Sequence, residues 1–244
     1  MSQAGLVQDA QSSSSDTHDA GSMSQTPTHD HHNAGLLALI PPASRRLVEI
    51  GCSTGAMARE WRRLHPDCDW FGVDIDPVRA ALARQHCQQV AVMDIEQADD
   101  AFFAQHAGRD CWVFGDVLEH LRDPWRLLRR IRAGMSGDAC VVACIPNVQH
   151  WSVQAALSRG EFRYVDAGLL DRTHLRWFTR QTLIELFEDS GFGIVEFGST
   201  QMDAPQADTI LRSIAALAQC SGGDAVAAVN DAQAFQYLLR AVPE

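Results

Sequence analysis

Short apolar runs alternate along this chain with longer stretches in which apolar residues recur every three or four positions. Apolar runs of this kind are typical of strands buried on both faces of a sheet, and the wider spacing is typical of helices that pack on one side. The pattern predicts strands at 46–50, 70–73, 90–93, 111–114, 139–145, 194–198 and 235–241. It predicts helices at 33–40, 56–64, 77–87, 98–106, 124–135, 180–190 and 209–219.

Strands that alternate with helices imply parallel strands joined by helical crossovers. We therefore predict an α/β fold with a Rossmann-like, doubly wound sheet of about seven strands, mostly parallel, with the last strand antiparallel. In such a sheet the ligand lies in a crevice at the carboxyl ends of the strands.

Two segments depart from this alternation. Residues 1–32 are rich in Ser, Gln, Asp, Thr and His and contain almost no large apolar residue, so we predict a disordered tail. Its His29, His31 and His32 have no framework of carboxylates or cysteines around them, and we predict no metal site. Residues 33–244 are predicted to form one domain, in which the irregular segment 146–179 is an insertion that faces the substrate.

Charge and composition narrow the choice of partners. The net charge of −11 repels phosphate backbones and anionic membranes, so we expect a small molecule or a glycan rather than nucleic acid, with protein partners left open. All 20 basic residues are Arg, which excludes Schiff-base chemistry, Walker-type ATP binding and a lysine base. Seven cysteines without a C-x-x-C pair favour a reducing compartment, and no apolar run is long enough for membrane insertion. We therefore expect a cytoplasmic protein.

The first predicted strand ends in a glycine turn, 51–55, which reads G-C-S-T-G, and the second strand ends at Asp74. Glycines allow the backbone to approach a ligand closely. An acid at the end of the second strand is placed to accept the hydroxyl groups of a ribose. The pattern predicts a cofactor that contains a nucleoside.

Two other interpretations fit the turn less well. A dinucleotide fingerprint requires glycine where Ser53 stands. The letters also spell G-x-S-x-G, the nucleophile elbow of serine hydrolases, with Ser53 as the nucleophile. However, about one strand precedes Ser53, whereas a hydrolase sheet has several before its nucleophile, and no HGGG-like segment is present.

Together with Glu49, the turn follows the pattern E-x-G-x-G-x-G except at Ser53, and residues 30–242 resemble the class I S-adenosylmethionine-dependent methyltransferases. A serine is expected to fit the turn with a negative φ. The segment 146–151, P-N-V-Q-H-W, is similar to a bacterial subgroup associated with surface-polysaccharide and O-antigen biosynthesis. The resemblance implies S-adenosylmethionine as the cofactor. It implies these cofactor-binding residues: Glu49, Gly51, Ser53, Gly55, Asp74, Ile75, Asp94, Ile95 and Asp116.

The roles of two of these residues stay open at this point. Glu49 either contacts the amino group in the methionine part of the cofactor or accepts backbone hydrogen bonds that hold the turn. Asp116 faces either the methionine part or solvent.

The resemblance implies methyl transfer to a hydroxyl, or as a second choice to an amine, of a small molecule or glycan. One alternative is a cofactor-binding module without turnover in a biosynthetic complex, and another is a serine hydrolase that uses Ser53. Measurements of cofactor binding, of methylated product and of the reactivity of Ser53 would distinguish these three functions.

A base that removes the proton of a hydroxyl is worth roughly 10² to 10⁴ in rate, and the ordinary pKa of imidazole suits this task. The candidate catalytic residues are His120, His150, Asp171 and His174. Each has a structural alternative. Glu119 and His120 can cap the helix after the fourth strand, and Asp171 with His174 can hold the loop through Arg172 or Arg176.

Overall fold

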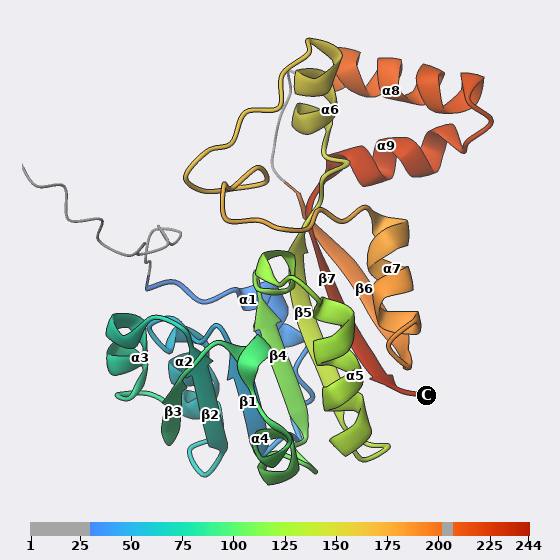
Figure 1. The fold of residues 1–244 in the computed structure, drawn as a ribbon. Coiled ribbons are helices and arrows are strands. Elements are labelled where there is room, and N and C mark those ends of the chain that lie inside the picture. Colours follow the sequence, from blue (N-terminus) through green and yellow to red (C-terminus); the bar gives the residue numbers. More distant parts are fainter. Residues whose placement is uncertain (1–29, 202–206) are drawn as a thin grey trace, which may run out of the picture.

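The strands form one mixed sheet (Figure 1). The computed structural model describes residues 30–201 and 207–244, so the predicted tail lies outside the described residues except for 30–32. The strands are β1 (Arg46–Ile50), β2 (Asp69–Asp74), β3 (Gln89–Val92), β4 (Cys111–Gly115), β5 (Cys140–Pro146), β6 (Phe192–Gln201) and β7 (Ala234–Pro243). Their order is β3-β2-β1-β4-β5-β7-β6, with β7 antiparallel to both neighbours and β1 to β5 paired in parallel. This confirms the predicted fold class.

Helices cover both faces of the sheet (Figure 1). They are α1 (Ala34–Ala38), α2 (Ala56–Leu64), α3 (Pro77–Ala83), α4 (Asp100–Gln105), α5 (Pro124–Gly134), α6 (Trp151–Ser158), α7 (Arg180–Glu188), α8 (Asp208–Cys220) and α9 (Ala225–Gln233). Two 3₁₀ turns, η1 (Ile95–Gln97) and η2 (Leu118–His120), follow β3 and β4. Across residues 30–201 and 207–244, every helix is too short or too polar to traverse a bilayer.

Two neighbouring residues of β1, whose side chains point to opposite faces of the sheet, show which helices cover each face. Leu47 belongs to the core cluster that contains residues of α1, α2 and α3. Val48 belongs to the cluster that contains residues of α4, α5 and α7. Because successive side chains of a strand point to opposite faces, the uninterrupted apolar run is explained by burial on both sides.

A third cluster joins α6, α8 and α9 beyond the ends of β5 and β7 (Figure 1). In it Trp151 packs against a core that includes Leu211, Ile214 and Ala232. The sequence did not predict α6 or α9, because the segment 146–179 was interpreted as irregular and α9 carries mainly small residues. The buried Asn147 connects this unit to the sheet, since its Nδ2 donates hydrogen bonds of 2.7 Å to the carbonyls of both Asp231 and Ala234.

His106, at the end of α4, makes the stability of the fold depend on pH. Its side chain is 1% exposed, its ring centroid lies 4.2 Å from that of Phe71, and neither ring nitrogen has a hydrogen-bond partner among the described residues. Burial, with a smaller contribution from Arg109, lowers the pKa of His106 to about 4. Between about pH 6.5 and 4 the unfolded chain therefore binds a proton that the folded chain does not, and folding is weakened as the pH falls.

The variant His106→Phe is expected to remove this dependence. We expect the loss in free energy of unfolding between pH 7.5 and pH 5 to be smaller than in the parent protein by about 2 kcal/mol. Urea unfolding at the two pH values measures the difference. The same loss in both proteins would contradict a buried neutral imidazole at this position.

Candidate active site

The glycine turn lies at the carboxyl end of β1, where the backbone conformation requires its two glycines. Gly51 has φ +73° and Gly55 has φ +78°, a region that favours glycine. A Cβ atom at Gly51 would lie 2.5 Å from Cγ2 of Val117, and one at Gly55 would lie 3.1 Å from the Cα atom of Ala83. The backbone conformation and the close packing against Val117 and Ala83 therefore explain both glycines, and the turn lies directly before α2.

Ser53 differs from the sequence expectation. Its φ is +47°, whereas a negative value was expected, so this prediction was wrong. A left-handed conformation costs a residue with a Cβ atom about 1–2 kcal/mol. In this conformation the backbone N–H of Ser53 donates a 2.8 Å hydrogen bond to Oδ2 of Asp74, which ties the turn to the end of β2.

Asp74 is buried, and its carboxylate is held from two sides. Oδ2 accepts from Ser53, and Oδ1 accepts a 2.9 Å hydrogen bond from the backbone N–H of Asp76. Each carboxylate oxygen retains capacity for a further donor. The neighbouring Ile75 is an exposed apolar residue at the same strand end. Asp74 is thus a fixed acceptor next to the glycine turn, as a ribose site requires.

Asp94 and Ile95 follow the next strand, β3. The Asp94 side chain caps η1 by accepting a 2.9 Å hydrogen bond from the backbone N–H of Glu96. Ile95 is buried in the core cluster on the α4 and α5 side. Their predicted contacts with the cofactor remain predictions.

Glu49 has a partner that the sequence did not suggest. Its Oε2 accepts a 2.9 Å hydrogen bond from the indole Nε1 of Trp70 on β2. Burial is the main cause that raises the pKa of Glu49 well above its usual range. The carboxyl group thus pairs with a neighbouring strand, and its proposed contact with the cofactor remains a prediction.

Asp116 follows β4 with φ +55°. Its Oδ1 accepts hydrogen bonds from the amide of Gln236 on β7 and from the thiol of Cys144 on β5. The protein around the carboxyl group desolvates it and raises its pKa to about 6, although part of the residue still reaches solvent. Asp116 is thus an exposed residue at the carboxyl end of β4, near the centre of the sheet.

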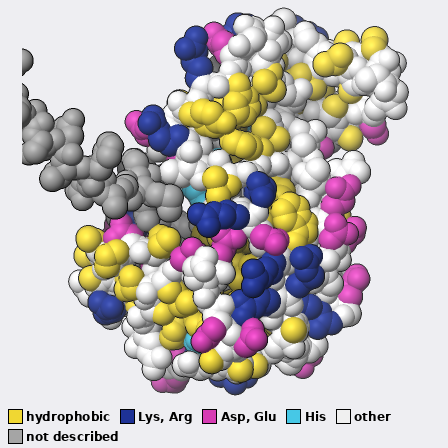
Figure 2. Space-filling view, viewed as in Figure 1, with side chains coloured by type: hydrophobic (Ala, Val, Ile, Leu, Met, Phe, Trp, Pro, Cys, Tyr) yellow, Lys and Arg dark blue, Asp and Glu magenta, His cyan; other side chains and the backbone are white. Residues whose placement is uncertain are grey.

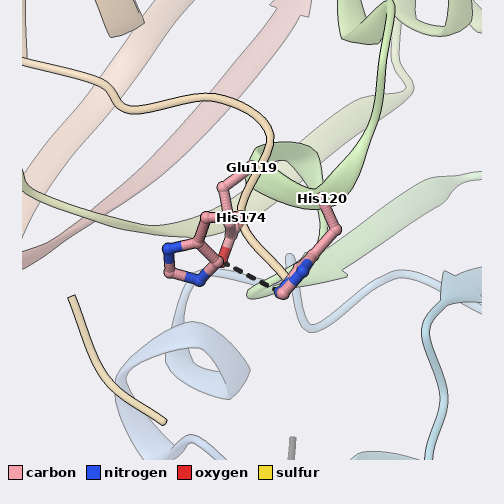
Figure 3. Close-up of side chains that lie close together, drawn as sticks. All are labelled: Glu119, His120 and His174. Atoms are coloured by element: carbon pink, nitrogen blue, oxygen red, sulfur yellow. Dashed lines mark ion pairs between the residues drawn. The ribbon is translucent and has the colours of Figure 1, made fainter. Parts of the chain in front are cut away.

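Three residues of the segments after β4 and α6 converge on one another (Figure 3). Glu119 and His120 lie on η2, and His174 comes from the loop before α7. The Nε2 atoms of both histidines lie 3.9 Å from Oε1 of Glu119. We call Glu119, His120 and His174 the acid–imidazole cluster. Burial raises the pKa of Glu119 well above its usual range and lowers that of His120, and burial together with His120 lowers the pKa of His174 to about 4.

The backbone explains why residues so distant in sequence meet here. The N–H groups of Leu175 and Arg176 donate hydrogen bonds of 2.8 and 2.9 Å to the carbonyl oxygen of Glu119. These bonds fix the loop that carries His174 against η2. Capping of α5 was the structural alternative for Glu119 and His120, but the cap is made by Asp123, which accepts a 2.9 Å hydrogen bond from the N–H of Arg126.

Asp171 orients this loop through Thr173. Oδ1 of Asp171 accepts from the backbone N–H of Thr173 at 2.8 Å and from its hydroxyl at 2.7 Å. Nδ1 of His120 in turn lies 3.1 Å from the hydroxyl oxygen and 3.2 Å from the carbonyl oxygen of Thr173. Asp171 therefore contacts the cluster through a threonine, and Arg172 pairs with Asp166.

Comparison with known proteins shows the family to which the chain belongs. A family model described as a methyltransferase domain matches residues 29–196, more than half of the chain. The chain belongs to this family. It is 32% identical over 73 residues to the release factor glutamine methyltransferase of Escherichia coli K12, covering 30% of this chain and 26% of that protein. It is 30% identical over 115 residues to the trans-aconitate 2-methyltransferase of Methylobacterium nodulans, covering 47% of this chain and 43% of that protein.

A solved structure supports the fold of this methyltransferase domain. The magnesium protoporphyrin IX methyltransferase from Synechocystis PCC 6803, solved with bound SAH, superposes with a TM-score of 0.55 at 14% identity. The alignment covers 86% of this chain and 80% of the other. By contrast, the chain spans less than half the length of the two curated relatives.

The methyltransferase domain brings three of the four predicted catalytic residues together and separates the fourth. His120, His174 and Asp171 are joined by the contacts described above. His150 is the N-cap of α6, and its Nδ1 lies 2.8 Å from the hydroxyl of Ser152, with its ring against Trp151 and Phe235.

Two residues of the site were not predicted as functional. Glu119 was noted only as a helix cap, and the sequence gives no sign that its carboxylate is buried. Gln236 reaches Asp116 only because β7 inserts beside β5. The one available signal for Glu119 was the pair of letters E-H five residues after the end of the predicted strand 111–114.

The variant Ser53→Gly tests the strained turn. Glycine relieves the left-handed conformation, and we expect the free energy of unfolding to rise by about 0.5–1 kcal/mol with cofactor binding retained. Ser213→Gly, at an exposed position inside α8, is the matched control and is expected to lower it by a similar amount. Fluorophosphonate probes are expected to leave Ser53 unlabelled, because methyl transfer needs no nucleophilic serine. Stoichiometric labelling, or destabilisation by Ser53→Gly, would contradict this account of the turn.

Proposed function

We propose that this methyltransferase domain transfers the methyl group of S-adenosylmethionine to a hydroxyl oxygen of a small molecule or glycan. The observation that carries the proposal is the placement of two sites at the same edge of the sheet. The glycine turn with Asp74 follows β1 and β2, and the acid–imidazole cluster follows the adjacent β4. A cofactor bound along the first would direct its methyl group towards the second.

Residues at three strand ends bind different parts of the cofactor. Asp74 accepts hydrogen bonds from the ribose hydroxyls, and Asp94 accepts one from the amino group of the adenine. Asp116 lies near the methionine part. The bound SAH in the related Synechocystis structure supports this choice of cofactor. Gly51, Ser53 and Gly55 supply the backbone surface on which the cofactor lies.

Methyl transfer depends more on the alignment of the two reactants than on covalent catalysis by the protein. The acceptor oxygen forms a bond to the methyl carbon while the carbon–sulfur bond breaks and its electron pair stays on sulfur. The hydroxyl proton must also leave. Positioning can contribute about 7–11 kcal/mol to such a reaction, so the protein mainly holds the two reactants in line. The acid–imidazole cluster supplies the polar groups that face the hydroxyl.

An aromatic surface on the segment between α6 and α7, which also carries His174, supports an acceptor with a flat apolar face. Phe162, Tyr164 and Trp177 form a mutual set with ring centroids 5.7–6.1 Å apart, and Phe162 and Tyr164 are exposed. Figure 2 shows hydrophobic side chains gathered over the unit that contains α6. An aromatic ring or the apolar face of a sugar fits such a surface. This favours the sugar or aromatic hydroxyls as the class of acceptor to be tested.

The experiment is a transfer assay with methyl-labelled S-adenosylmethionine and a panel of phenolic, sugar and amine acceptors. We expect label on an oxygen atom together with equimolar S-adenosylhomocysteine. Label on a nitrogen atom would show that the acceptor group is an amine and not a hydroxyl. Tight cofactor binding without transfer to any acceptor would favour the module without turnover.

A further inference from the structure

The acid–imidazole cluster has the composition and compactness of a metal site (Figure 3). One ligand atom each from Glu119, His120 and His174 lies within 4.8 Å of the others. We propose that these three residues bind a divalent transition-metal ion, and that the acceptor hydroxyl occupies an open position on it. The amino-acid sequence predicted no metal site, and the geometry of these three side chains differs from that expectation.

The environment of the Glu119 carboxylate is the first argument. The side chain is 1% exposed, and neither oxygen has a hydrogen-bond donor among the described residues. The two histidine Nε2 atoms at 3.9 Å are too far for hydrogen bonds. A buried carboxylate without a donor is costly, and a cation between the three groups would remove that cost.

The orientation of His120 is the second argument. The only hydroxyl proton of Thr173 is donated to Asp171, and the Thr173 carbonyl can only accept. Nδ1 of His120 must therefore carry the proton that it donates to Thr173. This leaves Nε2 with a lone pair that faces Glu119. Metal-ligating histidines are commonly fixed in this way by a hydrogen bond from their other ring nitrogen.

The distances are compatible with one ion. Metal–nitrogen and metal–oxygen bonds of about 2.0–2.2 Å place neighbouring ligand atoms about 3–3.4 Å apart. The observed separations of 3.9 Å between Oε1 of Glu119 and each Nε2 require each ligand to move inward by less than about 1 Å. Side-chain rotation alone provides such a movement.

The ligand types select the class of ion and leave it accessible. Imidazole suits zinc, iron, copper and nickel ions, and two histidines with one carboxylate form the facial set of several iron sites, whereas magnesium and calcium prefer oxygen ligands. Three protein ligands leave one or more positions open. The side chain of His120 is 28% exposed, so the cluster is reached from solvent on that side.

The function of the ion rests on the proposed methyl transfer. A bound cation lowers the pKa of an oxygen ligand and orients it. The hydroxyl oxygen attacks the methyl carbon, the carbon–sulfur bond breaks with its electron pair on sulfur, and the hydroxyl proton passes to solvent water. The two imidazoles then act as ligands rather than as the base.

Titration of the metal-stripped, full-length protein with Co²⁺ tests the site without any activity measurement. We expect one equivalent to bind with new visible absorption bands. Glu119→Gln and His174→Asn should each weaken binding by at least about 100-fold. His65→Asn, at the end of α2, and a triple alanine variant of His29, His31 and His32 are controls expected to bind like the parent.

The outcomes separate the two proposals. No saturable Co²⁺ binding by the folded parent protein, or equal binding by Glu119→Gln and His174→Asn, would overturn the site. Binding that disappears with the three tail histidines would also overturn it. Full-rate methyl transfer by metal-stripped protein would overturn the role of the ion. Bound Co²⁺ in a protein that transfers no methyl group would support the site and count against the proposed function alone.

Discussion

Asp74→Ala is expected to weaken binding of S-adenosylmethionine by about 2–4 kcal/mol, which is roughly 30- to 1,000-fold in the dissociation constant. The substitution would remove the two charge-assisted hydrogen bonds that we propose between Asp74 and the ribose. It also frees the backbone N–H groups of Ser53 and Asp76, which the carboxylate holds at 2.8 and 2.9 Å, so the glycine turn loses its link to β2. Calorimetric titration with S-adenosylhomocysteine measures the change.

Asp76→Ala is the matched control, because the two carboxylates are two residues apart. Asp76 caps α3 by accepting a 2.7 Å hydrogen bond from the N–H of Val78. Its loss should lower the free energy of unfolding by about 1 kcal/mol and leave cofactor affinity nearly intact. An unchanged dissociation constant in Asp74→Ala would remove the ribose site from this strand end.

His174→Ala is expected to lower turnover by about 10² or more while cofactor affinity stays near that of the parent. The imidazole belongs to the acid–imidazole cluster, whose groups face the acceptor hydroxyl in the proposed reaction, and it makes no described contact with the glycine turn. Steady-state rates at saturating cofactor, combined with calorimetry, separate the two effects.

His150→Ala provides the comparison, since both histidines were predicted from the sequence as candidate bases. The ring of His150 contacts Trp151 and Phe235 rather than the cluster, so we expect a smaller loss of turnover than for His174→Ala. The reverse order of effects would place the acceptor hydroxyl beside α6 instead of beside η2.

The elements of the first half were predictable because their signals are local. The predicted strand 46–50 and helix 56–64 coincide with β1 and α2, since an apolar run, a glycine turn and an amphipathic stretch follow one another directly. The carboxylates at strand ends were found for the same reason. Pairing of parallel strands then places these ends at one edge of the sheet.

The acid–imidazole cluster could not be predicted in the same way. Glu119 and His174 meet because two backbone N–H groups of the later loop bind the carbonyl of Glu119, a contact that no short-range pattern records. The positive φ of Ser53 was likewise hidden, because it depends on the hydrogen bond to Asp74 from the next strand. Packing against α8 and α9 explains α6, whose own sequence has a weak helical pattern.

Hydrogen–deuterium exchange with and without S-adenosylhomocysteine tests the central claim most directly, because it reports the backbone of the cofactor site itself. We expect slower exchange in peptides that cover the glycine turn 51–55 and the strand ends at Asp74 and Asp94, and little change in α8 and α9. The protection at the turn should be absent in Asp74→Ala at the same ligand concentration. Saturating ligand that leaves these peptides unchanged, or that protects a different surface, would contradict the account.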